Sequence, residues 1–381
     1  MKEKYLNIIS FNIPYPPNYG GVIDVFYKLK SLSDNGVKII LHTFDYGRGH
    51  TPELEKYCDE IHYYKRKTGI FSQFSTLPYI VFSRRNKELL SNLQKNDYPI
   101  LFEGLHTCYY LSDSSLKNRL KIVRIHNIEH YYYRGLAKNA GTFPLRMYFN
   151  LEANKLEKFE NQLHFSNYLL PLSTTEQSYF ERKYGQEKTI YVPLFSPNNG
   201  PVSISEEVKP YVLFHGDLSN WENINAANFL IQNVASKGSD IEWIFAGLNP
   251  PRSLLELSKN YNNVSIYGSV PENELQQMIR EAAVNILYTN QVSGVKLKLL
   301  NALHNGHYCL ANKEMVDGSG LEDLCIIISK QPDEIIAEIR KCFQGKISEN
   351  DWKKRQEAFD EIYNNKKNAL IIKKILSFPQ L

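Results

Sequence analysis

The chain has 381 residues, more than one hydrophobic core usually organises, so two domains are expected. Its composition, 43% hydrophobic and 23% charged, is that of an ordinary globular protein and excludes a disordered chain. A net charge of +4 is too small to indicate nucleic acid as a partner.

The cysteines and the N-terminus predict a cellular location. Five cysteines are scattered without a Cys-x-x-Cys pair, and the opening MKEKYLNIISFNIP lacks the apolar core of a signal peptide. No run of 18 apolar residues is present, so no membrane-spanning helix is expected. We therefore expect a cytoplasmic protein, with attachment to the inner face of the plasma membrane as an open alternative.

In the first half of the chain, β-rich runs alternate with segments of helical apolar spacing. A strand is predicted over residues 5–14, a helix over 22–36 and a strand over 37–44. This strand, helix, strand order is typical of a parallel sheet. The alternation continues at 98–104, 121–129, 149–165, 167–173, 174–185 and 189–195.

Residues 196–210 (SPNNGPVSISEEVKP) have the composition of a linker, and the alternation restarts after them. The next predicted elements lie at 211–217, 223–238, 241–248, 253–261, 264–270, 272–282, 284–289, 293–306, 308–313 and 324–329, and a lysine-rich helix at 351–376 ends the chain.

These elements predict an α/β protein with two Rossmann-like, doubly wound domains facing a cleft. The expected parts are a first domain at 1–196, a linker at 197–208, a second domain at 209–355 and a C-terminal helix at 356–381. Ligands are expected at the carboxyl ends of the strands and in the cleft.

Residues 292–306 read VSGVKLKLLNALHNG, with Lys296 and Lys298 placed where a helix is predicted to begin. A helix N-terminus already carries free N–H groups and a partial positive charge. Two further cations there indicate an anionic ligand, and the alternative is a pair of solvated surface lysines.

Four segments together resemble the GT-B glycosyltransferases, specifically glycosyltransferase family 4. PYPPNYGG is similar to the family's Gly-Gly loop, and VRIHNIEHYYYRGLA to its His-Asn-x-Glu segment. FHGDLSNWENINAANF is similar to the opening of its second domain, and SGVKLKLLNALHNG to its donor signature. In order and spacing the four segments cover nearly the whole chain.

The resemblance implies a retaining, metal-independent hexosyltransferase that moves a sugar from a nucleotide diphosphate sugar to a glycan or lipid-linked glycan, in surface polysaccharide assembly. It implies an acceptor-binding first domain, a donor-binding second domain, a C-terminal helix that returns to the first domain, and no cofactor beyond the donor. His126 and Lys298 would be catalytic. The implied donor-binding residues are Gly20, Gly21, Asp217, Asn223, Gly247, Gly268, Ser269, Val270, Ser293, Gly294, Val295, Lys296 and Asn301, and the implied acceptor-binding residues are Asn127, Glu129 and Tyr15.

Two positions depart from the family pattern. Asn301 stands where the family usually has a glutamate that accepts hydrogen bonds from both ribose hydroxyls, and an amide has one acceptor oxygen for that task. Ser293 stands at the pattern's earlier acidic position. A nonenzymatic nucleotide-sugar-binding subunit therefore stays open, as does a nucleotide-sugar epimerase of the same fold, although the His-Asn-x-Glu segment argues against the epimerase.

His126 follows a β-rich run, which would place it at the carboxyl end of a strand. In a retaining transferase the departing phosphate can take the acceptor proton, so His126 would position and polarise the sugar rather than act as an obligatory base. The alternative is a hydrogen-bonded core histidine. Since no Asp-x-Asp pair and no His/Cys cluster has metal spacing, metal independence is predicted.

Residues 62–87 combine basic and aromatic side chains without a single acid. This composition suits an anionic bilayer surface, and the stretch is a candidate for peripheral membrane contact. The alternative is an insertion that covers the first domain's core with solvated basic ends.

Overall fold

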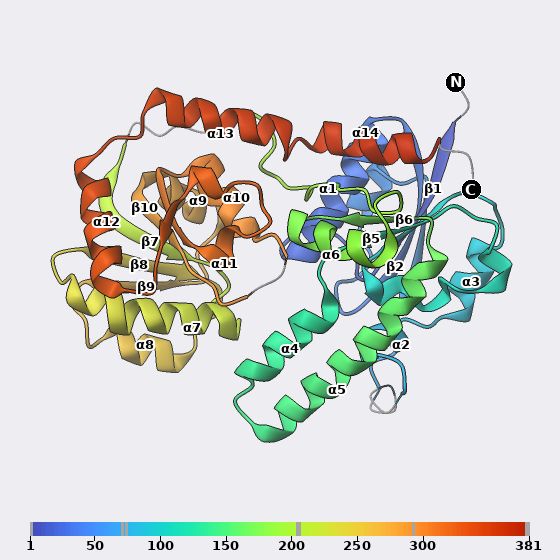
Figure 1. The fold of residues 1–381 in the computed structure, drawn as a ribbon, viewed down its shortest axis with the longest axis horizontal. Helices are drawn as coiled ribbons and strands as arrows, with labels where there is room; N and C mark the ends of the chain where they lie inside the picture. The colour runs from blue at the N-terminus through green and yellow to red at the C-terminus, as the bar shows by residue number, and fades with distance from the viewer. Residues whose placement is uncertain (1–2, 70–71, 73–74, 203–206, 292–293, 378–381) are drawn as a thin grey trace. The chain divides into compact units, whose positions relative to one another are not determined.

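The computed structural model describes residues 3–69, 72, 75–202, 207–291 and 294–377. The chain divides into two compact units, one of Met1–Pro197 with Tyr363–Leu381 and one of Asn198–Ile362. We call them the N-terminal and the C-terminal domain (Figure 1).

In its described residues the N-terminal domain has a six-stranded sheet of order β3-β2-β1-β4-β5-β6, in which all neighbours are parallel. The strands are β1 (Lys4–Ser10), β2 (Val37–Asp45), β3 (Glu60–Lys65), β4 (Ile100–Glu103), β5 (Lys121–Ile125) and β6 (Tyr168–Pro171). Because parallel neighbours need crossovers, helices connect successive strands, and the carboxyl ends of all six strands meet at one edge.

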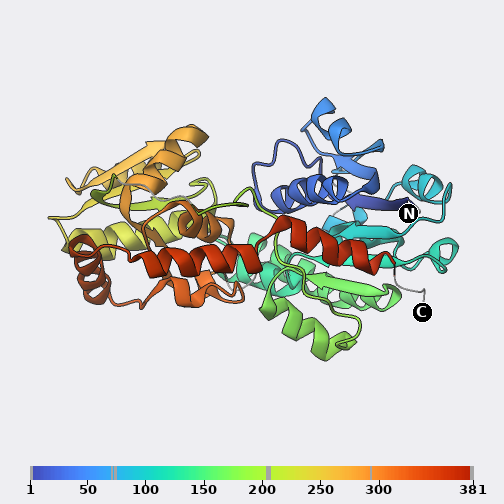
Figure 2. The ribbon, with the colours of Figure 1, turned by 90° about the horizontal axis from the view of Figure 1, so that it is seen from above.

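The helices of this domain are α1 (Gly20–Asp34), α2 (Tyr79–Phe82), α3 (Lys87–Leu93), α4 (Glu129–Asn139), α5 (Phe143–Glu160), α6 (Thr174–Tyr184) and α14 (Asn365–Ile375). Helix α1 buries Val22, Val25 and Leu29 in a core that also takes Ala369 and Ile372 of α14. Helix α14 therefore lies beside α1, as Figures 1 and 2 show.

In its described residues the C-terminal domain has a second parallel six-stranded sheet, of order β12-β11-β10-β7-β8-β9. The strands are β7 (Lys209–His215), β8 (Glu242–Gly247), β9 (Val264–Gly268), β10 (Ala282–Leu287), β11 (Tyr308–Asn312) and β12 (Ile326–Ile328). The helices are α7 (Trp221–Phe229), α8 (Arg252–Ser258), α9 (Glu272–Glu281), α10 (Leu297–Asn305), α11 (Lys313–Val316), α12 (Pro332–Gln344) and α13 (Glu349–Glu361).

The predicted α/β class with two Rossmann-like domains is confirmed. Two element predictions are wrong. Residues 189–195 form no strand, since only Thr189 makes an isolated bridge, to Leu169. The helix predicted at 356–381 is not one helix, because α13 ends at Glu361 and α14 begins at Asn365, whose turn is capped by the Asn364 side chain accepting from the Lys367 N–H at 3.0 Å.

Part of the described stretch within residues 62–87 packs into the interior of the N-terminal domain. Ile80 and Val81 are buried in its core, and the buried Arg84 donates through Nε to the Phe11 carbonyl at 2.8 Å. Ile70, Phe71 and Phe74 lie outside the described residues. Ile80 and Val81 therefore cover the core, as the alternative of an insertion over the core predicts, and membrane contact through residues 62–87 stays a prediction. Within the described residues, no helix combines the length and apolar composition needed to cross a bilayer.

Candidate active site

In the C-terminal domain, Lys298 lies in the first turn of α10, following Gly294, which has a φ of 76°. Its Nζ donates to Asn223 Oδ1 at 2.9 Å and lies 5.0 Å from the centroid of the Phe214 ring. Burial, with a smaller contribution from the charge of Lys296, lowers the pKa of Lys298 to about 8. Its ammonium is therefore held in place and poorly hydrated, the state in which it attracts an anion most strongly.

Asn223 connects Lys298 to the loop that follows β7. Its Nδ2 donates to the Asp217 carbonyl at 2.9 Å, and the Asp217 carboxylate accepts from the Ser219 N–H and hydroxyl at 2.9 and 2.7 Å. The structure thus brings the predicted Asp217 and Asn223 together with Lys298. The Asp217 side chain itself is engaged within its own turn.

Gly247 and Gly268 are the last residues of the next two strands of the same sheet, and Ser269 follows the second. A Cβ on Gly247 would lie 1.7 Å from the Gly216 carbonyl oxygen, so only glycine allows the loops after β7 and β8 to approach this closely. Ser269 has a φ of 57° and donates its N–H to the Gly247 carbonyl at 2.8 Å. Val270 packs against the apolar cluster beneath. Gly247, Gly268 and Ser269 therefore lie at the carboxyl edge of the sheet, where the Gly247 backbone closely approaches the loop after β7.

The remaining predicted donor residues surround the start of α10. Lys296 is the buried N-cap residue, and Val295 and Gly294 are half-buried before it, while Ser293 lies outside the described residues. Asn301 is one turn further along the helix, where its Oδ1 accepts from Asn305 Nδ2 at 2.7 Å. The acceptor oxygen on which a ribose contact would depend is thus already engaged.

Two further polar groups of this edge were missed in the sequence. His215 ends β7, and burial with the charge of Lys298 lowers its pKa to about 3, so it is neutral. Asn312 ends β11, where it accepts from the Thr289 N–H at 3.1 Å and donates to Glu314 Oε2 at 2.6 Å. The sequence feature that could have identified both residues is their position at the end of a predicted strand, which is the feature that identified His126.

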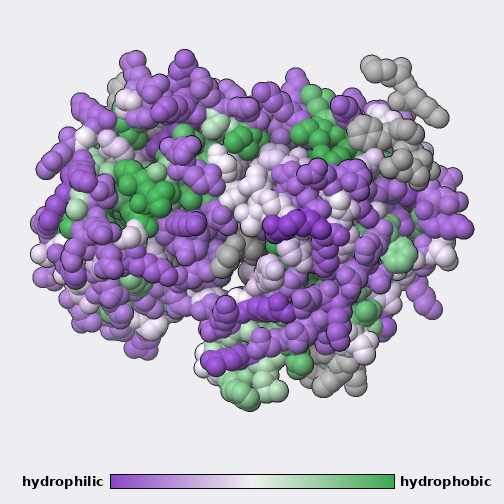
Figure 3. Space-filling view, in the orientation of Figure 1, coloured by the Kyte–Doolittle hydropathy of each residue, from purple (hydrophilic) through white to green (hydrophobic). Residues whose placement is uncertain are grey.

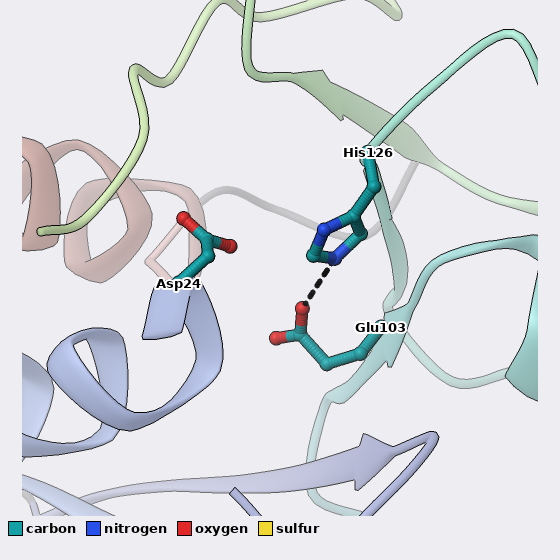
Figure 4. Close-up of side chains that lie close together, drawn as sticks. All are labelled: Asp24, Glu103 and His126. Atoms are coloured by element: carbon teal, nitrogen blue, oxygen red, sulfur yellow. Dashed lines mark hydrogen bonds and ion pairs between the residues drawn. The ribbon is translucent and has the colours of Figure 1, made fainter. Parts of the chain in front are cut away.

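In the N-terminal domain, His126 follows β5 and points toward Glu103, the last residue of β4 (Figure 4). His126 Nε2 lies 3.2 Å from Glu103 Oε2. Although burial alone would raise it, the pKa of Glu103 is lowered by Lys28 and by the hydrogen bond from His126. Because Glu103 is ionised, Nε2 carries a proton and donates to it, and in the tautomer with this proton alone Nδ1 is an acceptor.

Behind this pair lies a network of buried charges. Lys28 Nζ lies 2.7 Å from Asp24 Oδ2 and 2.9 Å from Glu103 Oε1, and Arg124 Nη2 lies 2.9 Å from Asp24 Oδ1. Burial would raise the pKa of Asp24, but Arg124 and Lys28 hold it well below its usual range. Asp24 also accepts from the Phe195 N–H at 2.9 Å. This network fixes the Glu103 carboxylate that orients His126.

Asp24, Glu103 and His126 are one group, among the described residues, whose ligand-type atoms lie within 4.8 Å of one another (Figure 4). The position of a cation between the two carboxylates is taken by the Lys28 ammonium, which contacts both. A metal ion would have to displace this lysine and leave its charge buried and unpaired. The donor set therefore fits an ion-pair network and does not fit a metal site.

Glu129 and Asn127 lie beside His126, and a histidine that the sequence reading missed joins them. Burial raises the pKa of Glu129 to about 8 against an opposing hydrogen bond from Asn127. Glu129 Oε1 lies 3.8 Å from Nδ1 of His106, which follows β4. The ring centroids of His106 and His126 lie 5.4 and 5.6 Å from that of Phe11.

Gly20, Gly21 and Tyr15 lie at the N-terminal end of α1 and before it. A Cβ on Gly21 would lie 2.5 Å from Cζ of Phe11, so Gly21 makes room for the ring that contacts His126. Gly20 is the first residue of α1. Tyr15 packs 5.5 Å from Phe26, ring to ring, in the apolar core, and no contact joins it to His126 among those described.

Two surface cavities are lined by residues other than the predicted site residues. One of about 510 Å³ adjoins the ends of β2 and β3 in the N-terminal domain, lined among others by Tyr46, His50 and Arg66. The other, of about 380 Å³, adjoins the starts of β7 and β11 in the C-terminal domain, lined among others by His307 and Trp352. Neither lining contains a predicted site residue, so volume alone does not locate the chemistry.

Two Rossmann-like domains with these polar strand edges form the GT-B glycosyltransferase fold. No family model matches the chain. Over 333 residues, covering 82% of this chain and 84% of the relative, it is 26% identical to an uncharacterized 44.6 kDa protein in the cps region of Klebsiella pneumoniae.

Three solved structures share the fold across almost their whole length. Anabaena Alr3699/HepE, in complex with UDP and glucose, has a TM-score of 0.65 at 13% identity, covering 98% of this chain and 99% of that one. TarM of S. aureus has a TM-score of 0.67 at 11% identity, covering 99% of this chain and 99% of that one. The lipopolysaccharide outer core galactosyltransferase WaaB has a TM-score of 0.60 at 15% identity, covering 97% of this chain and 99% of that one. At such identities the likeness is one of fold.

Proposed function

We propose that the protein is a retaining glycosyltransferase that moves a hexose from a nucleotide diphosphate sugar to a glycan or lipid-linked glycan. The observation that carries the proposal is the position of Lys298 in a domain of the GT-B fold. Its ammonium is fixed by Asn223 at 2.9 Å beside the N-terminus of α10, with Lys296, the N-cap residue, two positions before it. A diphosphate is the ligand whose charge matches two lysines and a helix N-terminus.

The same groups suit the departure of the diphosphate. When the bond between the anomeric carbon and the phosphate oxygen breaks, negative charge accumulates on that oxygen, where Lys298 and Lys296 would stabilise it. Since these lysines supply the positive charge, we propose that catalysis needs no metal ion. Loss of activity with a chelator, restored by manganese, would contradict this proposal.

On the acceptor side, we assign positioning to His126. With Nε2–H donated to Glu103, its Nδ1 would accept a hydrogen bond from a sugar hydroxyl. As the acceptor oxygen bonds to the anomeric carbon from the face that the diphosphate leaves, the acceptor proton passes to the departing phosphate. Glu129, protonated near neutral pH because burial raises its pKa to about 8, would donate a hydrogen bond to the acceptor rather than serve as a base.

The acceptor class is supported by the relatives. WaaB is described as a lipopolysaccharide outer core galactosyltransferase, and the Klebsiella pneumoniae relative lies in a cps region. We therefore propose that the acceptor belongs to surface polysaccharide assembly, on the cytoplasmic side of the membrane.

One observation favours a second candidate, a nucleotide-sugar-binding subunit without activity. Asn301 Oδ1 already accepts from Asn305 Nδ2 at 2.7 Å, which leaves less capacity for a ribose diol than a glutamate would have. Weak nucleotide binding without turnover is what this candidate predicts.

A panel of nucleotide sugars, screened by thermal shift, tests the donor, and UDP-sugars come first because HepE was crystallised with UDP-glucose. The release of nucleoside diphosphate is then measured with and without glycan acceptors. Release that requires an acceptor supports a transferase. Conversion of the donor alone indicates an epimerase, and binding without any release indicates the inactive subunit.

A further inference from the structure

Helices α4 and α5 form an antiparallel hairpin, joined by residues 140–142, that projects from the body of the N-terminal domain (Figure 1). Its base is fixed by polar contacts. The Tyr179 hydroxyl donates to Glu160 Oε1 at 2.8 Å, and the Tyr79 N–H donates to Glu152 Oε2 at 2.6 Å. Arg134 pairs with Glu157 across the two helices at 2.6 Å. The hairpin is therefore held in a defined direction.

The tip of this hairpin exposes large apolar side chains. Every residue from 141 to 147 is exposed. Phe143 is 70% exposed, Met147 49% and Leu151 57%, and their i, i+4, i+8 spacing puts them in one stripe along α5, with Leu145 on another side of the same turns. In Figure 3 green and pale atoms gather at the end of the same hairpin.

An exposed apolar stripe on a well-anchored element indicates a surface that is covered in use. The stripe from Phe143 to Leu151 is about 12 Å long at the helical rise per residue. Amphipathic helices bury their apolar face to a depth of about 5–10 Å in the boundary between headgroups and acyl chains. If the hairpin enters the bilayer at a tilt, the stripe from Phe143 to Leu151 would reach this depth.

The charges of the hairpin select the kind of surface. Lys138, Arg146 and Lys158 are exposed. Of its acids, Glu129, Glu152 and Glu160 are buried, and Glu157 is paired with Arg134. The charge that faces water around the apolar tip is therefore positive, complementary to anionic lipid headgroups.

We propose that the tip of the α4–α5 hairpin docks the protein on an anionic phospholipid bilayer. Phe143, Met147 and Leu151 enter the boundary between headgroups and acyl chains, and Lys138 and Arg146 contact the phosphates. Membrane docking stands on this geometry alone. The consequence that the acceptor is a lipid-linked rather than a soluble glycan rests on the proposed function.

Sedimentation with vesicles tests the docking. The full chain is mixed with vesicles of phosphatidylcholine alone and of phosphatidylcholine with phosphatidylglycerol, and binding to the second kind is expected. A variant carrying Phe143→Ser, Met147→Ser and Leu151→Ser should partition about tenfold or more less strongly. Leu370→Ser is the matched control, since Leu370 is 46% exposed on α14, and it should bind like wild type.

A second set of variants tests the contribution of the basic side chains. Lys138→Gln with Arg146→Gln should weaken binding to the anionic vesicles several-fold, and added salt should weaken wild type more than this variant. All variants are checked for unchanged thermal unfolding and for nucleoside diphosphate binding by calorimetry. Failure to bind any nucleotide would count against the proposed function. Binding to vesicles tests the docking surface independently of that function.

Three results would overturn the docking proposal. In the first, wild type is not retained on anionic vesicles at all. In the second, the serine variant is retained as strongly as wild type and the Leu370 control. In the third, light scattering finds a concentration-dependent dimer that the serine variant abolishes, which would assign the stripe to a second copy of the chain.

Discussion

Lys298 gives a sharp test of the proposed donor site because its charge titrates in an accessible pH range. Burial lowers its pKa to about 8, and its ammonium is held against Asn223 and the Phe214 ring. Only the protonated form brings positive charge to a diphosphate. The affinity for a nucleoside diphosphate should therefore fall as the pH rises through about 8, because the lysine of the free protein loses its charge there.

The size of the effect follows from the pKa. One pH unit below it about nine-tenths of the lysine is charged, and one unit above it about one-tenth. If the charged form alone binds, the dissociation constant rises about tenfold between about pH 7 and about pH 9, which corresponds to about 1.4 kcal/mol. Lys298→Arg keeps its charge over this range, so its affinity should not show this change.

Calorimetric titration of both proteins at the two pH values measures the effect. Any titration of the nucleotide itself cancels in the ratio of the two affinities. Equal pH dependence in wild type and Lys298→Arg would refute the reasoning, and so would wild-type affinity in a well-folded Lys298→Met. In a turnover assay Lys298→Ala should lose roughly two or more orders of magnitude, since it removes a charge that acts on the leaving group.

Three further predictions concern the other groups of the site. His126→Ala should reduce turnover far more than nucleotide affinity, because His126 belongs to the N-terminal domain; a large loss of nucleotide binding with little loss of rate, in the same two assays, would contradict its assignment. Glu129 has a pKa raised to about 8, so the folded protein holds its proton and loses stability as the pH rises from about 4.5 through about 8. Glu129→Gln should remove a penalty on the free energy of unfolding on the order of 3 to 5 kcal/mol above that pH range. The difference in melting temperature between variant and wild type should therefore be larger near pH 9 than near pH 5. An equal difference at both pH values would show that Glu129 is already ionised near pH 5. Asn301→Glu should tighten binding of the cognate ribonucleotide by about 1 kcal/mol, a gain that calorimetry with a deoxyribose analogue should not find.

The sequence predicted what depends on local order. Apolar runs that alternate with amphipathic segments predict a parallel sheet with helical crossovers, because a strand buried on both faces needs a continuous apolar run. The helix predicted at 293–306 is present as α10, which begins later, at Leu297; a glycine followed by helical apolar spacing is a local signal.

Local signals failed where a distant partner decides the structure. Residues 189–195 have the composition of a strand and donate from Ile190 and Val192 to β6, but their pairing with β6 forms only an isolated bridge at Thr189 and no continuous ladder. The composition of residues 62–87 left a membrane surface and a covering of the core both open, and only the fold shows that Ile80 and Val81 pack into the core of their own domain. The exposed Phe143 looks in the sequence like any apolar residue of an amphipathic helix, because exposure depends on which face of α5 the rest of the fold covers.

The chain's order of apolar and polar residues thus determined the class of fold, the restart of the pattern in the second domain and the neighbourhood of Lys298. The tertiary structure alone decided the electrostatic state of the site. Glu103 is held as a buried anion because Lys28, 75 residues away in sequence, and His126 lie against it, and burial of Glu129 and Lys298 moves both pKa values toward neutrality. The physical reason is that desolvation and ion pairing depend on every group within a few ångströms, and folding brings those groups together from distant parts of the chain.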